Sequence, residues 1–152
     1  MKTKAFLVIS FAWLVISCQK NASTQQETQQ QSTTLSIESF SSFPEEITGC
    51  SCYFSNNIDE FAQQNYIYAS DFEKVAFLKI NGSFEKFEQI YNKKVDENKN
   101  VLQAKNQNYS IVVEMTDQPS ESEETQAKSG TIQLTSKDGS TTTIPFYGEC
   151  GC

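Results

Sequence analysis

Four cysteines of this chain occur in two Cys-x-Cys pairs that lie far apart in the sequence. Cys50 and Cys52 form the first pair, and Cys150 and Cys152 form the second. Thiols at this spacing could join in disulfides, hold a soft metal ion such as Cu(I) or Zn²⁺, or take part in thiol–disulfide exchange. The choice among these kinds of chemistry depends on the redox state of the compartment and on the elements that carry the cysteines.

The N-terminal segment combines a basic start, a short apolar run and a fifth cysteine. Lys2 and Lys4 precede an apolar run at 5–16. This run has the length of a signal-peptide core and is too short to cross a bilayer core of about 30 Å as a helix. It ends in the stretch VISC at 15–18, which is an aliphatic residue, a tolerant position, a small residue and a cysteine. The segment resembles the lipobox signal peptide of bacterial lipoproteins.

This resemblance implies that the signal peptide, residues 1–17, is removed and that Cys18 carries a covalent diacylglycerol, with no other cofactor. It implies a lipid-anchored protein of the bacterial cell envelope. Gln19 follows in place of the Asp that often retains such lipoproteins in the inner membrane, which favours the outer membrane. Because thiols outside the cytoplasm tend to oxidise, this compartment favours disulfides for the other four cysteines.

A polar segment separates the lipobox from the rest of the chain. Residues 18–34 are rich in Gln, Ser and Thr and contain almost no apolar side chain. Such a segment cannot bury enough apolar surface to offset the entropy of ordering it. We therefore expect the lipidated cysteine and a flexible tether over 18–34, followed by a single β-rich domain over 35–152.

The composition excludes several classes of function. The chain has 12 basic and 19 acidic residues, and every basic residue is lysine. An acidic chain without arginine is a poor candidate for binding nucleic acid. Histidine is absent, so a Ser–His or Cys–His nucleophile cannot be built. The sequence therefore predicts a protein that is not an enzyme.

Apolar alternation and hairpin turns predict an all-β domain. Asn81-Gly82 and Asp138-Gly139 each separate two runs rich in apolar residues, which is a strong signal for a β-hairpin. Pro145 indicates an edge position or a bulge. We expect a small antiparallel sandwich or barrel. Its predicted strands are 48–54, 65–69, 74–80, 83–91, 109–115, 130–136 and 141–152, with a helical turn at 58–64 and an acidic loop at 117–130.

Strand geometry favours two disulfides between the cysteine pairs. Residues two apart in a strand face the same side, so both pairs are expected to point into the core. If the two segments pair antiparallel, Cys50 stands opposite Cys152 and Cys52 opposite Cys150, at a spacing that suits disulfides. These bonds would join the first strand to the C-terminus. The alternatives are a four-thiolate Cu(I) or Zn²⁺ site and a strained, redox-active disulfide within one pair.

Four tyrosines could supply a surface for a partner. Tyr66 and Tyr68 stand two positions apart, so we expect them to share a strand face. With Tyr53 and Tyr147 they could form an exposed aromatic patch. The alternative is that these residues are half-buried core.

The domain also resembles uncharacterised secreted bacterial proteins that carry a GCSCYF-like stretch and a terminal CGC, a resemblance that implies no activity. We expect a membrane-tethered envelope lipoprotein whose disulfide-stapled β domain is a non-catalytic binding or structural module. Its expected partners are the membrane, through the lipid, and a protein or another envelope ligand. A metal-binding protein that uses the four thiolates and a thiol–disulfide redox protein are the alternatives.

Overall fold

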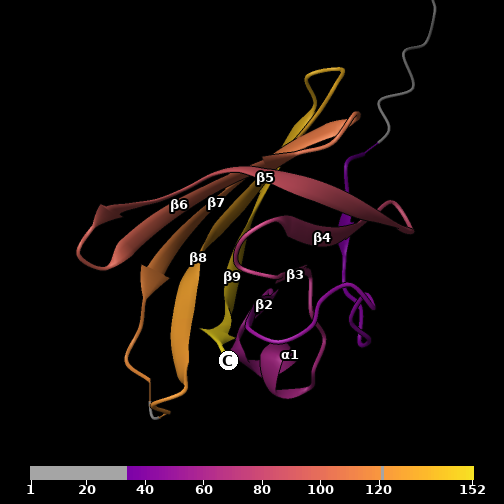
Figure 1. Cartoon of the computed structure of the whole chain (residues 1–152). Helices are drawn as coiled ribbons and strands as arrows, with labels where there is room; N and C mark the ends of the chain where they lie inside the picture. The colour runs from indigo at the N-terminus through magenta and orange to yellow at the C-terminus, as the bar shows by residue number, and fades with distance from the viewer. Residues whose placement is uncertain (1–33, 121) are drawn as a thin grey trace, which may run out of the picture. The chain divides into compact units, whose positions relative to one another are not determined.

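The computed structural model describes residues 34–120 and 122–152, which form a β-rich domain with one short helix (Figure 1). The expected signal peptide, Cys18 and the expected tether as far as residue 33 lie outside the described residues. In the described part of the chain, no helix has the length and apolar character needed to span a membrane. The elements in chain order are β1 (Ile37–Glu38), β2 (Ser51–Ser55), α1 (Ile58–Ala62), β3 (Tyr68–Ser70), β4 (Val75–Ile80), β5 (Ser83–Asp96), β6 (Lys99–Lys105), β7 (Tyr109–Asp117), β8 (Thr125–Ser136) and β9 (Thr141–Gly151).

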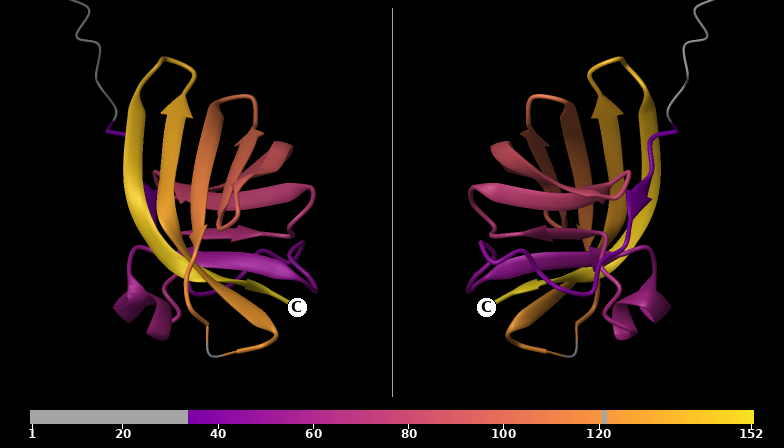
Figure 2. Two further views of the ribbon diagram at one scale, coloured as in Figure 1. Left: turned by 90° about the vertical axis from the view of Figure 1, so that its left-hand side faces the viewer. Right: turned by 90° about the vertical axis from the view of Figure 1, so that its right-hand side faces the viewer.

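Strands β2 to β9 form a closed antiparallel barrel in which each strand pairs with the next one along the chain. The pairing of β2 with β9 closes the barrel, and we call this closing pair the β2–β9 seam. The short strand β1 is added to the sheet by pairing with β4. Two side views show the strands wrapped around a common interior (Figure 2). The fold is therefore the barrel form of the expected all-β class.

The two expected hairpins are confirmed. Asn81 and Gly82 connect β4 to β5 with φ values of 48° and 85°, and two positive φ values are what a two-residue type I′ turn requires. Asp138 and Gly139 lie between β8 and β9, where Gly139 has φ 89°. The Asx-Gly sequences thus determine where two pairs of neighbouring strands reverse direction.

The expected acidic loop at 117–130 is wrong over its second half. Strand β7 ends at Asp117 and β8 already begins at Thr125. The error has a physical cause, because Gln126 and Lys128 are polar residues at positions of β8 that face a cavity. Apolar alternation, which reveals a half-buried strand in a sequence, is therefore missing from this part of β8.

Pro145 lies in β9 beyond the end of β2. The register sets Ser55, the last residue of β2, opposite Tyr147, so in the described sheet Pro145 pairs with Thr131 of β8 alone. A residue without an N–H group is tolerated at such a position because one side of the strand lacks a partner. The expected edge strand is therefore wrong, because β9 lies between β2 and β8, and Pro145 is tolerated only because β2 ends before it reaches this position.

Stacked aromatic rings and aliphatic side chains fill the barrel interior. Phe54 lies between Phe146 and Tyr68, with ring centroids 4.1 Å and 4.9 Å away and nearly parallel planes. Each such side chain that is fully buried contributes about 1.5–3 kcal/mol to stability. The larger aliphatic residues of β4, β6, β7 and β8 in the same core are Leu78, Ile80, Leu102, Ile111, Val113, Ile132 and Leu134.

Candidate functional site

Two disulfides join β2 to the end of β9. Cys52–Cys150 and Cys50–Cys152 are both formed, and the Cα atoms are 4.0 Å apart in each. The strand register places Cys52 directly opposite Cys150. The expected pairing between the two motifs is therefore confirmed. The four sulfurs are bonded in two pairs, each with one sulfur from each motif, so they do not form a four-thiolate metal site or a disulfide within one motif.

The two disulfides have different surroundings. Cys52 and Cys150 are each 6% exposed and belong to the interior core. Cys50 and Cys152 are exposed, because they lie just outside the ends of β2 and β9. The expectation that both pairs point into the core is thus wrong for the outer disulfide, Cys50–Cys152, and right for the inner disulfide, Cys52–Cys150.

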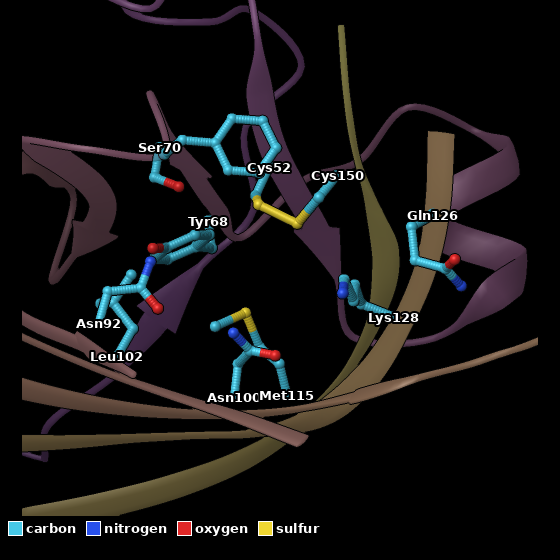
Figure 3. Close-up of a pocket in the computed structure, with 11 residues that line it drawn as sticks. Cys52, Tyr68, Ser70, Asn92, Asn100, Leu102, Met115, Gln126, Lys128 and Cys150 are labelled. Atoms are coloured by element: carbon cyan, nitrogen blue, oxygen red, sulfur yellow. A yellow bond between two sulfur atoms is a disulfide. The ribbon is translucent and has the colours of Figure 1, made fainter. Parts of the chain in front are cut away.

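A cavity of about 220 Å³ lies at this end of the barrel, with the inner disulfide in its wall (Figure 3). We call it the mouth cavity. Its mixture of apolar surface and a few polar groups is typical of small-molecule sites. Its apolar wall consists of Cys52, Tyr68, Phe72, Leu102, Met115 and Cys150. Its polar groups belong to Ser70, Asn92, Asn100, Gln126 and Lys128.

Two features of the barrel leave this space open. First, β4 pairs with β5 only from Ser83 to Glu88, whereas β5 continues to Asp96 beside β6. The second feature is the size of the side chains that face inward. Aromatic rings such as that of Phe54 occupy the core, whereas the short side chain of Ser70 lines the mouth cavity. The cavity therefore follows from strand length and side-chain volume.

The hydroxyl of Ser70 is buried in the cavity wall without a hydrogen bond. Ser70 is 1% exposed, and its Oγ has no hydrogen-bond partner among the described residues. Ser70 is close enough to Tyr68 to lower the pKa of its phenol, yet the two hydroxyls do not form a hydrogen bond of ordinary geometry. A buried hydroxyl without a partner costs about 1–3 kcal/mol. A ligand in the cavity could recover this free energy.

Tyr68 presents a neutral phenol to the cavity. Burial raises the pKa of Tyr68 far above its ordinary value of 10.0, while the neighbouring Ser70 hydroxyl acts to lower this pKa and the nearby charge of Asp71 acts to raise it. The phenol therefore stays protonated at any physiological pH. Figure 3 shows the hydroxyls of Tyr68 and Ser70 and the amide of Asn92 around one side of the space, with Met115 across from the inner disulfide.

The turn after β3 holds Phe72 in a left-handed conformation at the cavity. Its φ is 66°, which costs a bulky residue about 1–3 kcal/mol. The carboxylate of Asp71 compensates, because its Oδ1 accepts hydrogen bonds from the backbone N–H groups of Glu73, Lys74 and Val75 at 3.2, 2.8 and 2.8 Å. Burial tends to raise the pKa of Asp71, but these backbone donors outweigh burial and lower it below 3.8. Ionised Asp71 thus stabilises the turn that carries Phe72, whose side chain lines the cavity.

The charge beside the cavity is balanced by an ion pair. The ammonium group of Lys128 on β8 contacts the carboxylate of Asp117 on β7. The Lys128 side chain is 13% exposed and that of Asp117 is 31% exposed, so the pair is partly shielded from water. The positive charge that lines the cavity is therefore neutralised within the domain.

Three of the four candidate tyrosines lie together outside the barrel. Tyr53 stacks on Phe61 of α1 at 5.6 Å and contacts Tyr66 at 5.4 Å, while Phe61 also contacts Tyr147 at 5.5 Å. Tyr53 and Tyr147 are half-buried, and Tyr66 is buried. Tyr68 lies instead in the interior core, so the four residues do not form one exposed patch.

A β-bulge separates Tyr66 from Tyr68. The register sets Phe54 opposite Tyr68, and the N–H of Ile67 also donates to the carbonyl of Phe54 at 2.7 Å. Two residues of one strand thus oppose a single residue of the other, which shifts the alternation of side chains by one position. The expectation that Tyr66 and Tyr68 share a face is therefore wrong, because Tyr66 packs outside and Tyr68 inside.

The polar residues of the mouth cavity were not identified from the sequence. The sequence does contain a signal for them. Several of these residues occupy the next inward-facing position of a strand after its last apolar residue. Ser70 follows Tyr68 in this way, and Asn100 precedes Leu102. A polar residue at an inward position next to the end of a strand therefore indicates a barrel mouth.

Comparison with known proteins found no relative of this chain. No protein-family model matches it, and neither a curated protein nor a solved structure gives a significant match. Its function is therefore inferred from its residues and their geometry.

Proposed function

We propose that this protein is a lipid-anchored protein of the bacterial envelope whose barrel binds a small molecule in the mouth cavity without transforming it. The observation that carries binding is the Ser70 hydroxyl, which is buried in the cavity wall and has no hydrogen-bond partner within the described domain. Proteins pair nearly all of their buried polar groups, so an exception beside a cavity needs a physical reason. A bound ligand that pairs with the hydroxyl supplies that reason.

The disulfides have a structural part in this proposal. The inner disulfide lies in the wall of the cavity and joins the two strands of the β2–β9 seam. Fixing the seam keeps the cavity in one shape when it is empty. A site that is already formed loses less conformational entropy when it binds a ligand. This role needs neither a metal ion nor thiol–disulfide exchange.

The N-terminal sequence supports the anchor. The lipobox at 15–18 supports lipidation of Cys18, and Gln19 supports the outer membrane. A lipid with two or more acyl chains would hold the protein firmly to the bilayer, since each buried methylene contributes about 0.8 kcal/mol. A flexible tether of the length of 19–34 would span about 20–25 Å on average. The barrel would then reach its ligand in the water next to the membrane.

Metabolic labelling tests the anchor. A bacterium that expresses the full chain is grown with an alkyne analogue of palmitate, and the protein is probed for the label. We expect label on the natural chain and none on Cys18→Ser, because the thiol is the site of lipid attachment. Ser23→Ala, a change within the expected tether, should keep the label. Equal labelling of Cys18→Ser would refute the anchor.

Methyl NMR tests binding with very few signals. The sequence has two methionines, Met1 and Met115, and Met115 lines the mouth cavity. The full chain is labelled with [methyl-¹³C]methionine, extracted in detergent and titrated separately with toluene, phenol and benzoate. Met115→Leu identifies the signal of the cavity. A saturable shift of that signal with any of the three compounds supports the proposal, and the absence of a saturable shift with all three contradicts it.

A further inference from the structure

We propose that the ligand of the mouth cavity is a small, uncharged aromatic compound that carries a hydroxyl group. This inference rests on the proposed binding function and names the chemistry of its ligand. It follows from four properties of the cavity, which are its volume, the kind of atoms in its apolar wall, the free hydroxyl of Ser70 and the balance of charge beside it.

The volume sets the size of the ligand. The cavity measures about 220 Å³. An apolar cavity of about 150 Å³ in a protein interior holds one benzene molecule, so this one has room for about nine non-hydrogen atoms. A single six-membered ring with two or three substituent atoms fits this size, whereas a sterol or a long acyl chain would have to extend far out of the barrel.

The apolar wall favours an aromatic ring. It contains the thioether of Met115, the two sulfurs of the Cys52–Cys150 disulfide and the ring of Tyr68. Sulfur atoms contact aromatic rings favourably, by about 0.3–1.5 kcal/mol for a thioether, and aromatic pairs add about 0.5–1.5 kcal/mol beyond the area they bury. An aliphatic ligand of the same volume would gain only the term for buried area.

The Ser70 hydroxyl calls for a hydrogen-bonding group on the ligand. Ser70 is 1% exposed and its Oγ is unpaired in the described structure. A hydroxyl can both donate and accept, so a ligand hydroxyl can pair with it in either direction. A purely apolar ligand would cover the Ser70 hydroxyl and leave it unpaired, which costs free energy. The site should therefore select a ring with a hydroxyl over the same ring without one.

The charges beside the cavity favour a neutral ligand. Lys128, whose side chain lines the cavity, is already paired with Asp117. An anion would have to displace this carboxylate, and a cation would meet the ammonium group. The chain as a whole has 19 acidic and 12 basic residues, which further opposes the approach of an anion. Burial of an unpaired charge on the ligand would also be costly.

The experiment compares ligand pairs in two matched serine variants. Affinities for phenol, toluene, cyclohexanol and benzoate are measured from the Met115 methyl signal in the full chain, in Ser70→Ala and in Ser55→Ala. Ser55 is the control because it is also a fully buried serine with an unpaired Oγ in the described domain, but it does not line the cavity. The ratio of phenol to toluene affinity is compared between proteins, so partition of the compounds into detergent cancels.

We expect the phenol-to-toluene ratio to fall about tenfold in Ser70→Ala and to stay unchanged in Ser55→Ala, since one hydrogen bond is lost. We also expect phenol to bind more tightly than cyclohexanol and benzoate in the natural chain. An unchanged ratio in Ser70→Ala would overturn recognition of the hydroxyl. Equal binding of cyclohexanol would overturn the aromatic preference, and tighter binding of benzoate would overturn neutrality. Failure of every compound to bind would overturn the proposed function itself.

Discussion

The two disulfides should contribute to stability in a strongly non-additive way. Cys50–Cys152 spans a sequence separation of 102 residues, and Cys52–Cys150 spans one of 98. In the chain-entropy model, either bond alone restricts the unfolded chain by about 4.7 kcal/mol. The two loops are nested, however. Once one bond exists, the other closes only a small ring that contains residues 50–52 and 150–152. The second bond therefore adds only about 2 kcal/mol to the free energy of unfolding.

The perturbation is removal of each disulfide alone and of both together. In the outer variant, Cys50 and Cys152 are changed to alanine. In the inner variant, Cys52 and Cys150 are changed to alanine. In the four-alanine variant, all four cysteines are changed to alanine. Loss of the outer bond should lower the free energy of unfolding by about 2 kcal/mol. Loss of the inner bond should cost about 1–2 kcal/mol more, because its sulfurs are packed in the core. Loss of both should exceed the sum of the single losses by about 2.5 kcal/mol.

Urea unfolding measures these differences. The free energy of unfolding is obtained by linear extrapolation for each protein without reductant, at a single pH and temperature. The coupling energy is the loss of stability in the four-alanine variant minus the sum of the losses in the inner and outer variants. Loss of the packing of the inner sulfurs occurs in both the inner variant and the four-alanine variant, so it cancels in this difference. The natural chain in reductant is a control, and its stability should approach that of the four-alanine protein.

Two results would refute this reasoning. Additive losses would mean that each disulfide acts on the folded domain, for example through packing, and not through nested loops in the unfolded chain. A loss of about 5 kcal/mol on removal of the outer bond alone would mean that the inner bond does not restrict the unfolded chain. Either result would remove the entropic account of why two crosslinks stand side by side at the β2–β9 seam.

Three further changes test other parts of the structure. Gly148→Ala should destabilise the barrel by about 1–3 kcal/mol in urea unfolding, because a Cβ there would lie 2.2 Å from the carbonyl oxygen of Tyr53 and 2.6 Å from Cδ1 of Phe54. The pKa of Asp71 is lower in the folded than in the unfolded chain, so its stabilising effect is complete above about pH 4 and is lost as the pH falls through the folded-state pKa. Asp71→Asn should therefore make stability depend less on pH below about pH 4 in acid unfolding curves, and an unchanged dependence would contradict this account. Ser70→Ala should stabilise the ligand-free protein by about 1 kcal/mol, and a loss of stability would mean that the hydroxyl has a partner.

Local signals in the sequence predicted much of this fold. Asn81-Gly82 and Asp138-Gly139 located two hairpins because few other residues adopt positive φ at low cost. The two Cys-x-Cys pairs predicted the β2–β9 seam and its register. In an antiparallel pair of strands, the inner cysteines Cys52 and Cys150 stand opposite each other, and so do the outer cysteines Cys50 and Cys152. The choice between sandwich and barrel needed the structure, because strand closure depends on twist and strand length along the whole sheet.

The errors of sequence reasoning fall where local rules and the tertiary structure disagree. The bulge at Ile67 places the side chains of Tyr66 and Tyr68 on opposite faces of the strand. No residue type in that stretch predicts the bulge. Polar Gln126 and Lys128 hid the start of β8 because their inward positions face a cavity and not the core. Positions that break the local pattern are expected at functional sites, which agrees with the place of the mouth cavity.

The first and last strands of the barrel, β2 and β9, pair to close it, and this delays disulfide formation until the end of synthesis. At synthesis rates of about 5–20 residues per second, Cys52 emerges about 5–20 s before Cys150, which stands 98 residues later. During this interval the first cysteine pair has no native partner, and the seam stays open. A chain cut short before β9 would keep two free thiols at Cys50 and Cys52 and an unpaired edge on β2. Formation of both disulfides therefore requires synthesis of the chain through Cys152, and free thiols at Cys50 and Cys52 would distinguish a truncated molecule from one with a closed barrel.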